Sequence, residues 1–278
     1  MSVQWNSDTY PQRPTLTARD WLRVIWRAAA LGGLVFGGLA VLLLCRLFER
    51  PLCGLRRPVT PYITQFVCRG AFLILGITLH VRGAPMTARG AVVANHSSWL
   101  DIFALNAGKR VYFVSKSEVA DWPGIGWLAR ATGTVFIERN RAQAKSQTEI
   151  FEARLLAGHK LLFFPEGTST DGLRVLPFKT TLFQSFFADG LREALSIQPV
   201  TLRYKAPEGI DSRVYGWWGD MDFAPHLLAT LGLACQGEVE VIYGTPLKVA
   251  EFTDRKALAK ACEEAIRQAL LLESPVSW

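Results

Sequence analysis

The stretch "VVANHSSWLDIF", residues 92–103, changes its pattern halfway along. It begins as a short valine-rich apolar run, typical of a buried strand, and its second half opens the helical pattern "SSWLDIFALNAG". Ser97 or Ser98 can cap that helix, which places His96 at the carboxyl end of the strand and Asp101 in the first turns of the helix. The stretch therefore predicts a strand that passes directly into a helix, the building unit of an α/β fold.

The same stretch holds a candidate catalytic pair. A residue just before a helix and one about a turn inside it can meet side by side, so the Asp101 carboxylate can bond one ring nitrogen of His96. The other nitrogen is then free to take a proton, and no enzyme nucleophile is required if the substrate brings its own hydroxyl. The alternative is that Asp101 only complements the helix dipole and His96 is a packed polar residue. In isolation a histidine and an aspartate five residues apart are weak support for catalysis.

From about residue 83 onward, strand-like and helical patterns alternate. Strand-like runs are "RVYFVSK", "TVFIER", "HKLLFFPEG", "IQPVTLRY" and "GEVEVIYGTPLKV". Helical patterns are "NRAQAKSQTEIFEARLLAG", "LFQSFFADGLREAL" and "TDRKALAKACEEAIRQALLL". Short apolar strands that alternate with helices predict a three-layer α/β domain over residues 83–278, with a sheet flanked by helices.

The chain before this domain is organised differently. Residues 1–26 are interpreted as a loose polar leader followed by a basic amphipathic stretch, and residues 27–82 as a membrane-associated helical segment. Residues 28–45 form an uncharged apolar run near the lower limit for a membrane span. A second apolar stretch, residues 66–81, is interrupted by Arg69. No small-residue cleavage site follows the first run, which argues against a signal peptide.

Two membrane arrangements remain open. Basic residues flank the first apolar run on both sides, so the positive-inside rule gives no orientation for a single crossing. A helical hairpin that dips into the cytoplasmic leaflet places both basic ends on one side. The alternative is one ordinary transmembrane anchor followed by a buried helix or strand.

Composition restricts the partners. The chain has 278 residues, of which half are hydrophobic, and a formal net charge of +7. This balance favours contact with an anionic membrane surface. A long Lys/Arg run, zinc-ligand spacing and a basic heptad helix are all missing from the sequence, which argues against nucleic acid. Five widely spaced cysteines without a Cys-x-x-Cys motif are typical of reduced thiols in a cytosolic setting, and we expect no metal site.

Three further motifs follow the His96 stretch. "FIERN" ends a strand with Glu138 and Arg139, and "FFPEGTST", residues 163–170, ends another. "IQPVTL" contains an apolar stretch that ends at Pro199. Ligands in open α/β sheets bind outside the carboxyl ends of the strands, so we expect these motifs to converge with His96 on one crevice.

Together these motifs resemble those of the glycerolipid acyltransferase family, whose best-known bacterial members are 1-acyl-sn-glycerol-3-phosphate acyltransferases. The order is His-x-x-x-x-Asp, a strand ending in Arg, Phe-Pro-Glu-Gly-Thr, and an apolar stretch ending in Pro-Val, within residues 66–250. The resemblance implies an α/β three-layer acyltransferase domain with a mixed sheet, preceded by the N-terminal membrane-associated segment. It also implies transfer of a fatty acyl group from acyl-CoA or acyl carrier protein to the free hydroxyl of a lysophospholipid, with no cofactor. We expect the protein at the cytoplasmic face of the bacterial inner membrane.

The resemblance assigns roles by position. His96 would be the general base held by Asp101, and the acceptor hydroxyl would attack the thioester without an acyl-enzyme. Arginine suits the acceptor's phosphate because its planar fork pairs two oxygens at once. The implied substrate-binding residues are Arg139 for the phosphate with help from Lys116, then Glu166, Gly167 and Thr168 at the acceptor site, and Pro199 with Val200 on the acyl-donor side. Simpler structural readings are a surface charge for Arg139, a helix cap for Glu166 and a Glu118 partner for Lys116.

The acceptor is the least certain part of this reading. The most direct expectation is 1-acyl-sn-glycerol-3-phosphate, acylated to phosphatidate. However, "LPFKTTLF" has Thr181 where many phosphatidate-forming members have glycine. With "KSEVADWPGIGWLA" and "WWGDMDFAPHL", this run is similar to a proteobacterial branch that includes enzymes acylating lyso-ornithine lipid, which is the alternative acceptor. Asp220 and His226 show no spacing of a second site.

Two functions of other classes fit the sequence less well. An inactive membrane-anchored lipid-binding protein would be expected to have lost His96 or Asp101, and the chain keeps both. A serine esterase of α/β-hydrolase type needs a Gly-x-Ser-x-Gly elbow, which the sequence lacks.

Overall fold

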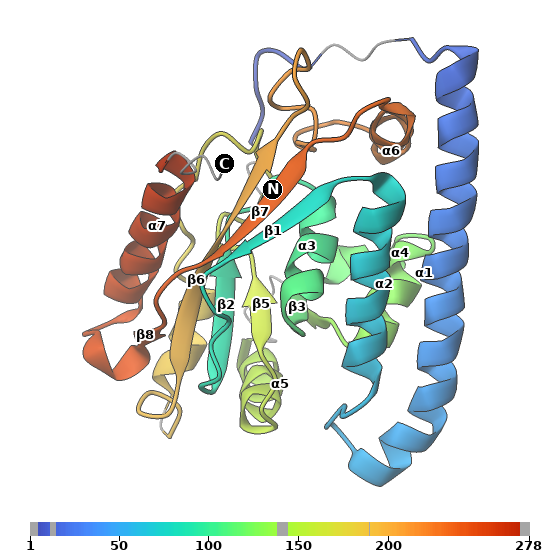
Figure 1. Ribbon diagram of the computed structural model, residues 1–278. Coiled ribbons are helices and arrows are strands. Elements are labelled where there is room, and N and C mark those ends of the chain that lie inside the picture. The colour runs from blue at the N-terminus through green and yellow to red at the C-terminus, as the bar shows by residue number, and fades with distance from the viewer. Residues whose placement is uncertain (1–4, 12–14, 138–143, 189, 273–278) are drawn as a thin grey trace.

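The computed structural model describes residues 5–11, 15–137, 144–188 and 190–272. Its centre is a mixed sheet in which the strands are ordered β1-β7-β6-β2-β5-β3-β4, with β8 paired to β6 (Figure 1). The strands are β1 (Thr78–Arg82), β2 (Gly90–Ala94), β3 (Tyr112–Lys116), β4 (Val135–Ile137), β5 (Leu161–Phe163), β6 (Ser196–Lys205), β7 (Glu238–Tyr243) and β8 (Leu247–Lys248). The predicted mixed α/β sheet is confirmed.

The strand directions bring one set of carboxyl ends together. Strands β6, β2, β5, β3 and β4 run parallel to one another. Strand β7 runs antiparallel to β6, and β1 runs parallel to β7. The chain therefore leaves β2, β3, β4 and β5 at one edge of the sheet, the edge where ligands bind in α/β folds.

Helices cover both faces of the sheet, as the three-layer prediction requires (Figure 1). One face is covered by α2 (Thr60–Leu75), α3 (Leu100–Gly108) and α6 (Phe223–Gly232). The other is covered by α5 (Ala144–Leu156), α7 (Arg255–Leu271) and a 3-10 turn, Leu182–Phe187. A further helix, α4 (Ile125–Thr132), lies between β3 and β4 in the chain.

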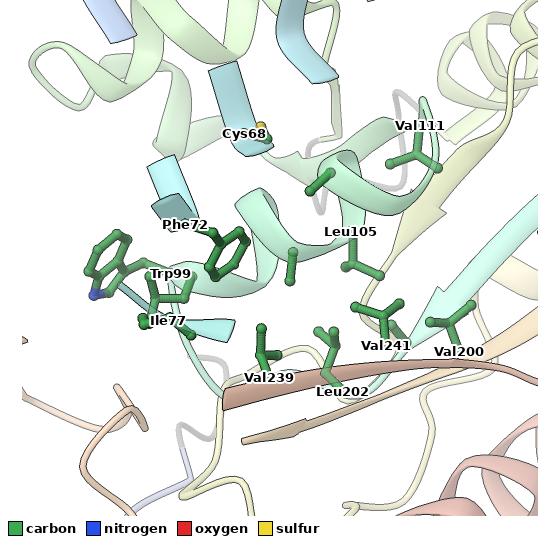
Figure 2. Packing of buried hydrophobic residues seen from close by; sticks show 14 of the residues in the cluster. Cys68, Phe72, Ile77, Trp99, Leu105, Val111, Val200, Leu202, Val239 and Val241 are labelled. Carbon is green, nitrogen blue, oxygen red and sulfur yellow. The ribbon is translucent and has the colours of Figure 1, made fainter. Parts of the chain in front are cut away.

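The alternation of side chains along β2 divides the core into two clusters. Val92 belongs to the cluster that includes Phe72 of α2 and Leu105 of α3, and Figure 2 shows these helices packed over strand residues such as Leu202. Val93 belongs to the cluster on the α5 and α7 side. All residues of β2 are buried, which explains why its sequence is a continuous apolar run rather than an alternating one.

One predicted helix is much shorter than expected. The pattern "LFQSFFADGLREAL" indicated a helix, but the structure has only the 3-10 turn Leu182–Phe187. Phe183 and Phe186 are both fully buried, and side chains three apart lie on one side of a 3-10 turn. Gly190, with φ near 80°, then interrupts the pattern. A single turn thus satisfies the core without a full helix.

The N-terminal apolar segment forms α1 (Ala18–Cys53), a helix of 36 residues that starts at a Thr17 capping box with Asp20. By length and composition it is able to cross a membrane, and only 6% of its most apolar window is buried. It lies beside α2 along the flank of the domain (Figure 1). Arg23 Nε donates to Gly232 O of α6 at 3.1 Å, which ties the start of α1 to the domain.

The α/β layers begin before the predicted boundary at residue 83. Strand β1 is hydrogen-bonded to β7 within the sheet, and Phe72 and Leu75 of α2 belong to the core. Gly76, with φ of 81°, ends α2 in the left-handed region and turns the chain directly into β1. The charge in this apolar stretch also has a partner, since Arg69 Nε donates to Ala107 O at the end of α3 at 2.9 Å.

The described part of the polar leader is packed rather than loose. The backbone N–H of Trp5 donates to Thr168 Oγ1 at 3.4 Å. The ring of Tyr10 stacks on Trp218 with centroids 5.8 Å apart. Trp5 therefore lies at the turn that contains Phe-Pro-Glu-Gly-Thr, whereas Tyr10 lies against Trp218.

Candidate active site

His96 and Asp101 meet as their spacing predicts. His96 lies two residues after the end of β2, Asp101 lies in the first turn of α3, and His96 Nδ1 is 2.7 Å from Asp101 Oδ2. The same Oδ2 accepts hydrogen bonds from the backbone N–H groups of Ser97 at 2.7 Å and Ser98 at 3.0 Å. Asp101 is fully buried, so its charge is balanced by donors rather than by water.

Tyr204 supplies a further donor to the pair. Its hydroxyl donates to Asp101 Oδ1 at 2.7 Å from β6, the strand beside β2. Burial, followed by the charge of Asp101, raises the pKa of Tyr204 well above its usual value, so the phenol stays protonated. Sequence reasoning missed Tyr204, because only the pairing of β6 with β2 brings it to Asp101.

The imidazole of His96 is also held from its face. It stacks on the ring of Phe164 with centroids 4.0 Å apart and planes 12° from parallel. Its side chain is 22% exposed, and Nε2 has no hydrogen-bond partner among the residues that the structure describes. This arrangement leaves Nε2 available to bond a ligand hydroxyl. The alternation in "LLFF" was a usable signal for Phe164, since Phe163 points into the opposite core cluster.

Glu166 positions the backbone around His96. Its Oε1 accepts from His96 N and its Oε2 from Leu176 N, both at 2.8 Å. The side chain is 2% exposed. Burial raises the pKa of Glu166 to about 8, against the lowering effect of its two backbone hydrogen bonds, and the nearby charges of Asp101 and Glu263 raise it further. Both oxygens of the Glu166 side chain thus bond backbone N–H groups of the protein.

The turn after Glu166 is closely approached by a lysine. Gly167 has φ of 72°, and a Cβ there would lie 2.6 Å from Lys179 Nζ. The backbone N–H of Lys179 also donates to Pro165 O at 2.8 Å. Thr168 accepts from Trp5 N, as described above. Lys179 belongs to the "FKTTLF" motif, but the sequence alone did not indicate a role for it.

The unusual Thr181 requires no special backbone. Its φ and ψ are −60° and −46°, values that any residue adopts. The side chain is exposed and lies two residues after Lys179, on the segment that runs beside the Gly167 turn. The replacement of the family's glycine is therefore free of backbone strain.

The remaining predicted residues fall in three different situations. Lys116 ends β3 at the same sheet edge as His96 and is half-buried. Arg139 lies outside the described residues, two positions after the end of β4. Pro199 lies inside β6, paired with Val93, and the strand continues to Lys205.

The expectation that a strand-end motif closes at Pro199 is therefore wrong. Strand β6 changes partner here, from β8 at Ile197 to β7 at Val200. A residue without an N–H fits this position because no ladder bond is required of it. Val200 itself is fully buried in the core cluster beneath α2 and α3. The sequence pattern was local, whereas the partner change is a property of the whole sheet.

An aromatic cluster lies behind the His96 turn. Trp99 packs edge-on against Phe223, and Trp217 packs against Phe223 with centroids 5.9 Å apart. The backbone N–H of Trp217 donates to Ser97 O at 2.8 Å. His226 Nδ1 accepts from Trp99 Nε1 at 3.0 Å. The aromatic residues of "WWGDMDFAPH" thus support the turn that carries His96 and Asp101.

Known proteins are similar to this chain over much of its length. The family model described as Acyltransferase matches residues 78–203. The lyso-ornithine lipid O-acyltransferase of Rhodobacter capsulatus is 56% identical over 268 residues, covering 96% of both chains. The 1-acyl-sn-glycerol-3-phosphate acyltransferase of Neisseria gonorrhoeae is 35% identical, covering 72% of this chain and 77% of its own.

A solved structure shows the same fold. The 1-acyl-sn-glycerophosphate (LPA) acyltransferase PlsC of Thermotoga maritima superposes with a TM-score of 0.65 at 22% identity. The match covers 91% of this chain and 95% of that one. It includes most of the N-terminal segment as well as the sheet.

Proposed function

Since the chain belongs to the glycerolipid (lysophospholipid) acyltransferase family, we propose that it is a lyso-ornithine lipid O-acyltransferase. The proposed acceptor is supported by the 56% identity to the Rhodobacter capsulatus protein over nearly the whole of both chains. The chemistry rests on one observation, the buried Asp101 carboxylate that holds His96 Nδ1 at 2.7 Å while Nε2 stays available. This reverses the order of acceptors expected from the motifs alone, which placed lysophosphatidate first.

The proposed reaction is a direct transfer. The acceptor's O–H proton passes to His96 Nε2 as its oxygen bonds to the thioester carbonyl carbon. The carbon–sulfur bond then breaks, and the leaving thiolate takes the proton back from the imidazolium. Asp101 stabilises that imidazolium and keeps the ring in one orientation. A positioned base contributes roughly 10²–10⁴ in rate, and orientation of the two substrates about 7–11 kcal/mol.

The acceptor's acidic group has candidate cationic partners in the chain, of which Lys116 and Lys179 lie at the same edge of the sheet as His96. We assign it to Arg139 and Lys116, with Lys179 beside the Gly167 turn as a third cation. Ornithine carries a carboxylate, and guanidinium and ammonium groups pair with carboxylate as well as with phosphate. Glu166 and Thr168 would act by holding the loops that form this wall.

A membrane location completes the proposal. Large apolar side chains are exposed along α1 and on neighbouring α2 and α4, among them Phe48, Phe66 and Trp127. At its start α1 is tied to α6. At its far end Arg57, in the turn after α1, donates to Ala131 O at 2.7 Å. A helix attached to the domain along its length favours a hairpin that lies in one leaflet over a single crossing, and we place it at the cytoplasmic face.

An acceptor panel tests the proposal. Purified protein in detergent would receive labelled acyl-CoA or acyl carrier protein with lyso-ornithine lipid, lysophosphatidate, lysophosphatidylcholine or no acceptor. We expect the highest kcat/KM with lyso-ornithine lipid. A higher value with lysophosphatidate would contradict the proposed acceptor and support the second candidate, which the Neisseria gonorrhoeae relative favours.

A further inference from the structure

A second site lies at the edge of the sheet opposite to His96. It is a pocket of about 900 Å³, lined by residues up to three positions before β2, β3 and β5, such as Thr87, Arg110 and Lys160. Its other wall is the turn between α1 and α2, from Leu52 to Tyr62. The catalytic pair follows the far end of β2, so this pocket is separate from the proposed reaction site.

The pocket concentrates positive charge. Its lining includes Arg56, Arg57, Lys109, Arg110 and Lys160, and contains no carboxylate. Within the described part of the chain, none of these five cations takes part in an ion pair. The repulsion among these like charges costs free energy, and a bound anion would lower that cost.

The hydrogen bonds of the half-buried cations go to neutral groups. Arg57 donates to Ala131 O, and Lys160 Nζ donates to Thr87 O at 3.2 Å. Behind the lining, Arg154 donates to Gly133 O and to His159 Nδ1, both at 2.6 Å. Carbonyls and an imidazole hold the side chains in place but leave their charges unneutralised. Arg57 and Lys160 are therefore held in position by the protein.

Burial already penalises these charges. It lowers the pKa of Arg57 and of Lys160, and lowers that of Arg154 to about 10. Burial, followed by the charges of Arg154 and Arg57, lowers the pKa of His159 to about 4, so that ring is neutral. A bound anion would relieve the repulsion among these neighbours.

The surroundings of the pocket indicate what kind of anion fits. Leu52 and Tyr62 line it and are also exposed, Leu52 by 82%. Leu55 and Val59 of the same turn are exposed apolar residues. The basic pocket is thus continuous with the apolar surface of α1 and α2. A molecule bound there would contact both cations and apolar side chains.

We propose that this pocket binds the phosphodiester headgroup of an anionic phospholipid, whose acyl chains lie on the exposed apolar surface of the α1–α2 turn. The ligand is a membrane lipid that is neither acceptor nor donor in the reaction. It anchors the end of α1 that lies away from α6. An acidic carrier protein fits less well, because the exposed leucines beside the cations match a lipid chain and not a charged protein surface.

The test uses cations whose side chains make no hydrogen bond within the described residues. The double variant Arg56→Gln/Lys109→Gln is compared with Lys256→Gln/Lys260→Gln, an equal loss of charge on exposed lysines of α7. Partitioning onto vesicles of phosphatidylcholine, alone or mixed with phosphatidylglycerol, is measured by sedimentation. With phosphatidylglycerol present we expect about tenfold to thirtyfold weaker binding of the pocket variant, at roughly 1 kcal/mol per cation, and no change for the α7 variant.

Further arms identify the ligand. Short-chain phosphatidylglycerol in solution should raise the melting temperature of the wild type and not of the pocket variant. An equal rise with inorganic phosphate would overturn the lipid assignment, as would a loss of acyl carrier protein binding with unchanged vesicle binding. Equal loss of vesicle binding in both variants would show general surface attraction and end the proposal. If the pocket variant fails to fold, Arg110→Gln/Lys160→Gln replaces it.

The anchor is independent of the proposed reaction. Acyl transfer in detergent should keep its wild-type kcat/KM in the pocket variant, since none of the substituted residues lies at the His96 edge. A loss of transfer in detergent would place the pocket in the reaction itself and contradict the proposal. Failure of the acceptor panel would leave the vesicle result unaffected.

Discussion

Asp101 connects the candidate site at the scale of single residues. It accepts from His96 Nδ1, two backbone N–H groups and the Tyr204 hydroxyl. The sequence allowed the first of these to be predicted, because a strand end and a helix start five residues apart lie together in any α/β unit. Tyr204 and Phe164 could not be assigned in the same way, since their positions depend on which strands become neighbours.

Substitutions at Asp101 and at Tyr204 should affect the reaction to different extents. Asp101→Asn should lower kcat by about 10²–10⁴, because the amide neither stabilises the imidazolium nor accepts from all of its donors. Tyr204→Phe removes one donor and should lower kcat by no more than about tenfold. Acyl-transfer kinetics on folded protein decide this. A kcat of Asp101→Asn within tenfold of the wild-type value would show that the carboxylate has only a structural role.

Glu166 gives a prediction about pH. Its pKa in the folded protein is raised to about 8 from a usual value near 4.5. The folded state therefore keeps a proton that the unfolded chain has released, and stability declines as the pH rises through that window. Each pKa unit corresponds to about 1.4 kcal/mol. The melting temperature of the wild type should fall between pH 5 and pH 8, and it should fall by more than the melting temperature of Glu166→Gln.

The control for this effect is a glutamate without burial. Glu193 is exposed, and Glu193→Gln should retain the wild-type decline of melting temperature with pH. If Glu166→Gln declined as steeply as the wild type, the proton would belong to another group. The hydrogen bond from Leu176 N is weakened in the glutamine variant at every pH, so only the slope is diagnostic.

At the scale of elements, α1 and α2 pack through small residues. A Cβ on Gly38 would lie 2.3 Å from Val67 Cγ2, whereas Gly33 of the same helix has nothing within 4 Å. Gly38→Ala should destabilise the protein by about 1–3 kcal/mol through overpacking, less a helix-propensity gain of up to about 1 kcal/mol. Gly33→Ala should be neutral or stabilising. Thermal unfolding in detergent compares the two, and equal shifts would mean that the helices do not touch there.

The elements also show where sequence patterns stop being sufficient. The apolar run of residues 66–81 was assigned to the membrane segment, yet it ends α2 and forms most of β1. Hydrophobicity does not distinguish lipid from a protein core, and only the Gly76 turn marks the change. The pattern after Leu182 failed for the opposite reason, since two core contacts three residues apart need only one turn.

For the whole molecule, we expect both ends of α1 on the same side of the membrane. Arg19→Cys and Arg56→Cys, each in a chain whose five native cysteines are replaced, should react with an impermeant maleimide only after the cells are permeabilised. The reason is that the domain contacts α1 near both of its ends. Labelling of one end in intact cells would show a transmembrane crossing and contradict the leaflet hairpin.

At this scale the fold class, the order of motifs and the reaction class were accessible from sequence, because each depends on residues close together in the chain. The acceptor was not, since Thr181 shows a departure from a pattern without showing its consequence. The basic pocket was also hidden, as its cations come from segments around residues 56, 110 and 160 that only the folded sheet brings together.

The most direct test of the central claim is acyl transfer to lyso-ornithine lipid by the wild type and by His96→Ala, with equal folding verified by circular dichroism. We predict measurable transfer by the wild type and a loss of at least about 10²-fold in the variant. Wild-type transfer that His96→Ala leaves unchanged would place the chemistry elsewhere in the protein. Absence of transfer by both, with transfer to lysophosphatidate retained by the wild type, would contradict the proposed acceptor.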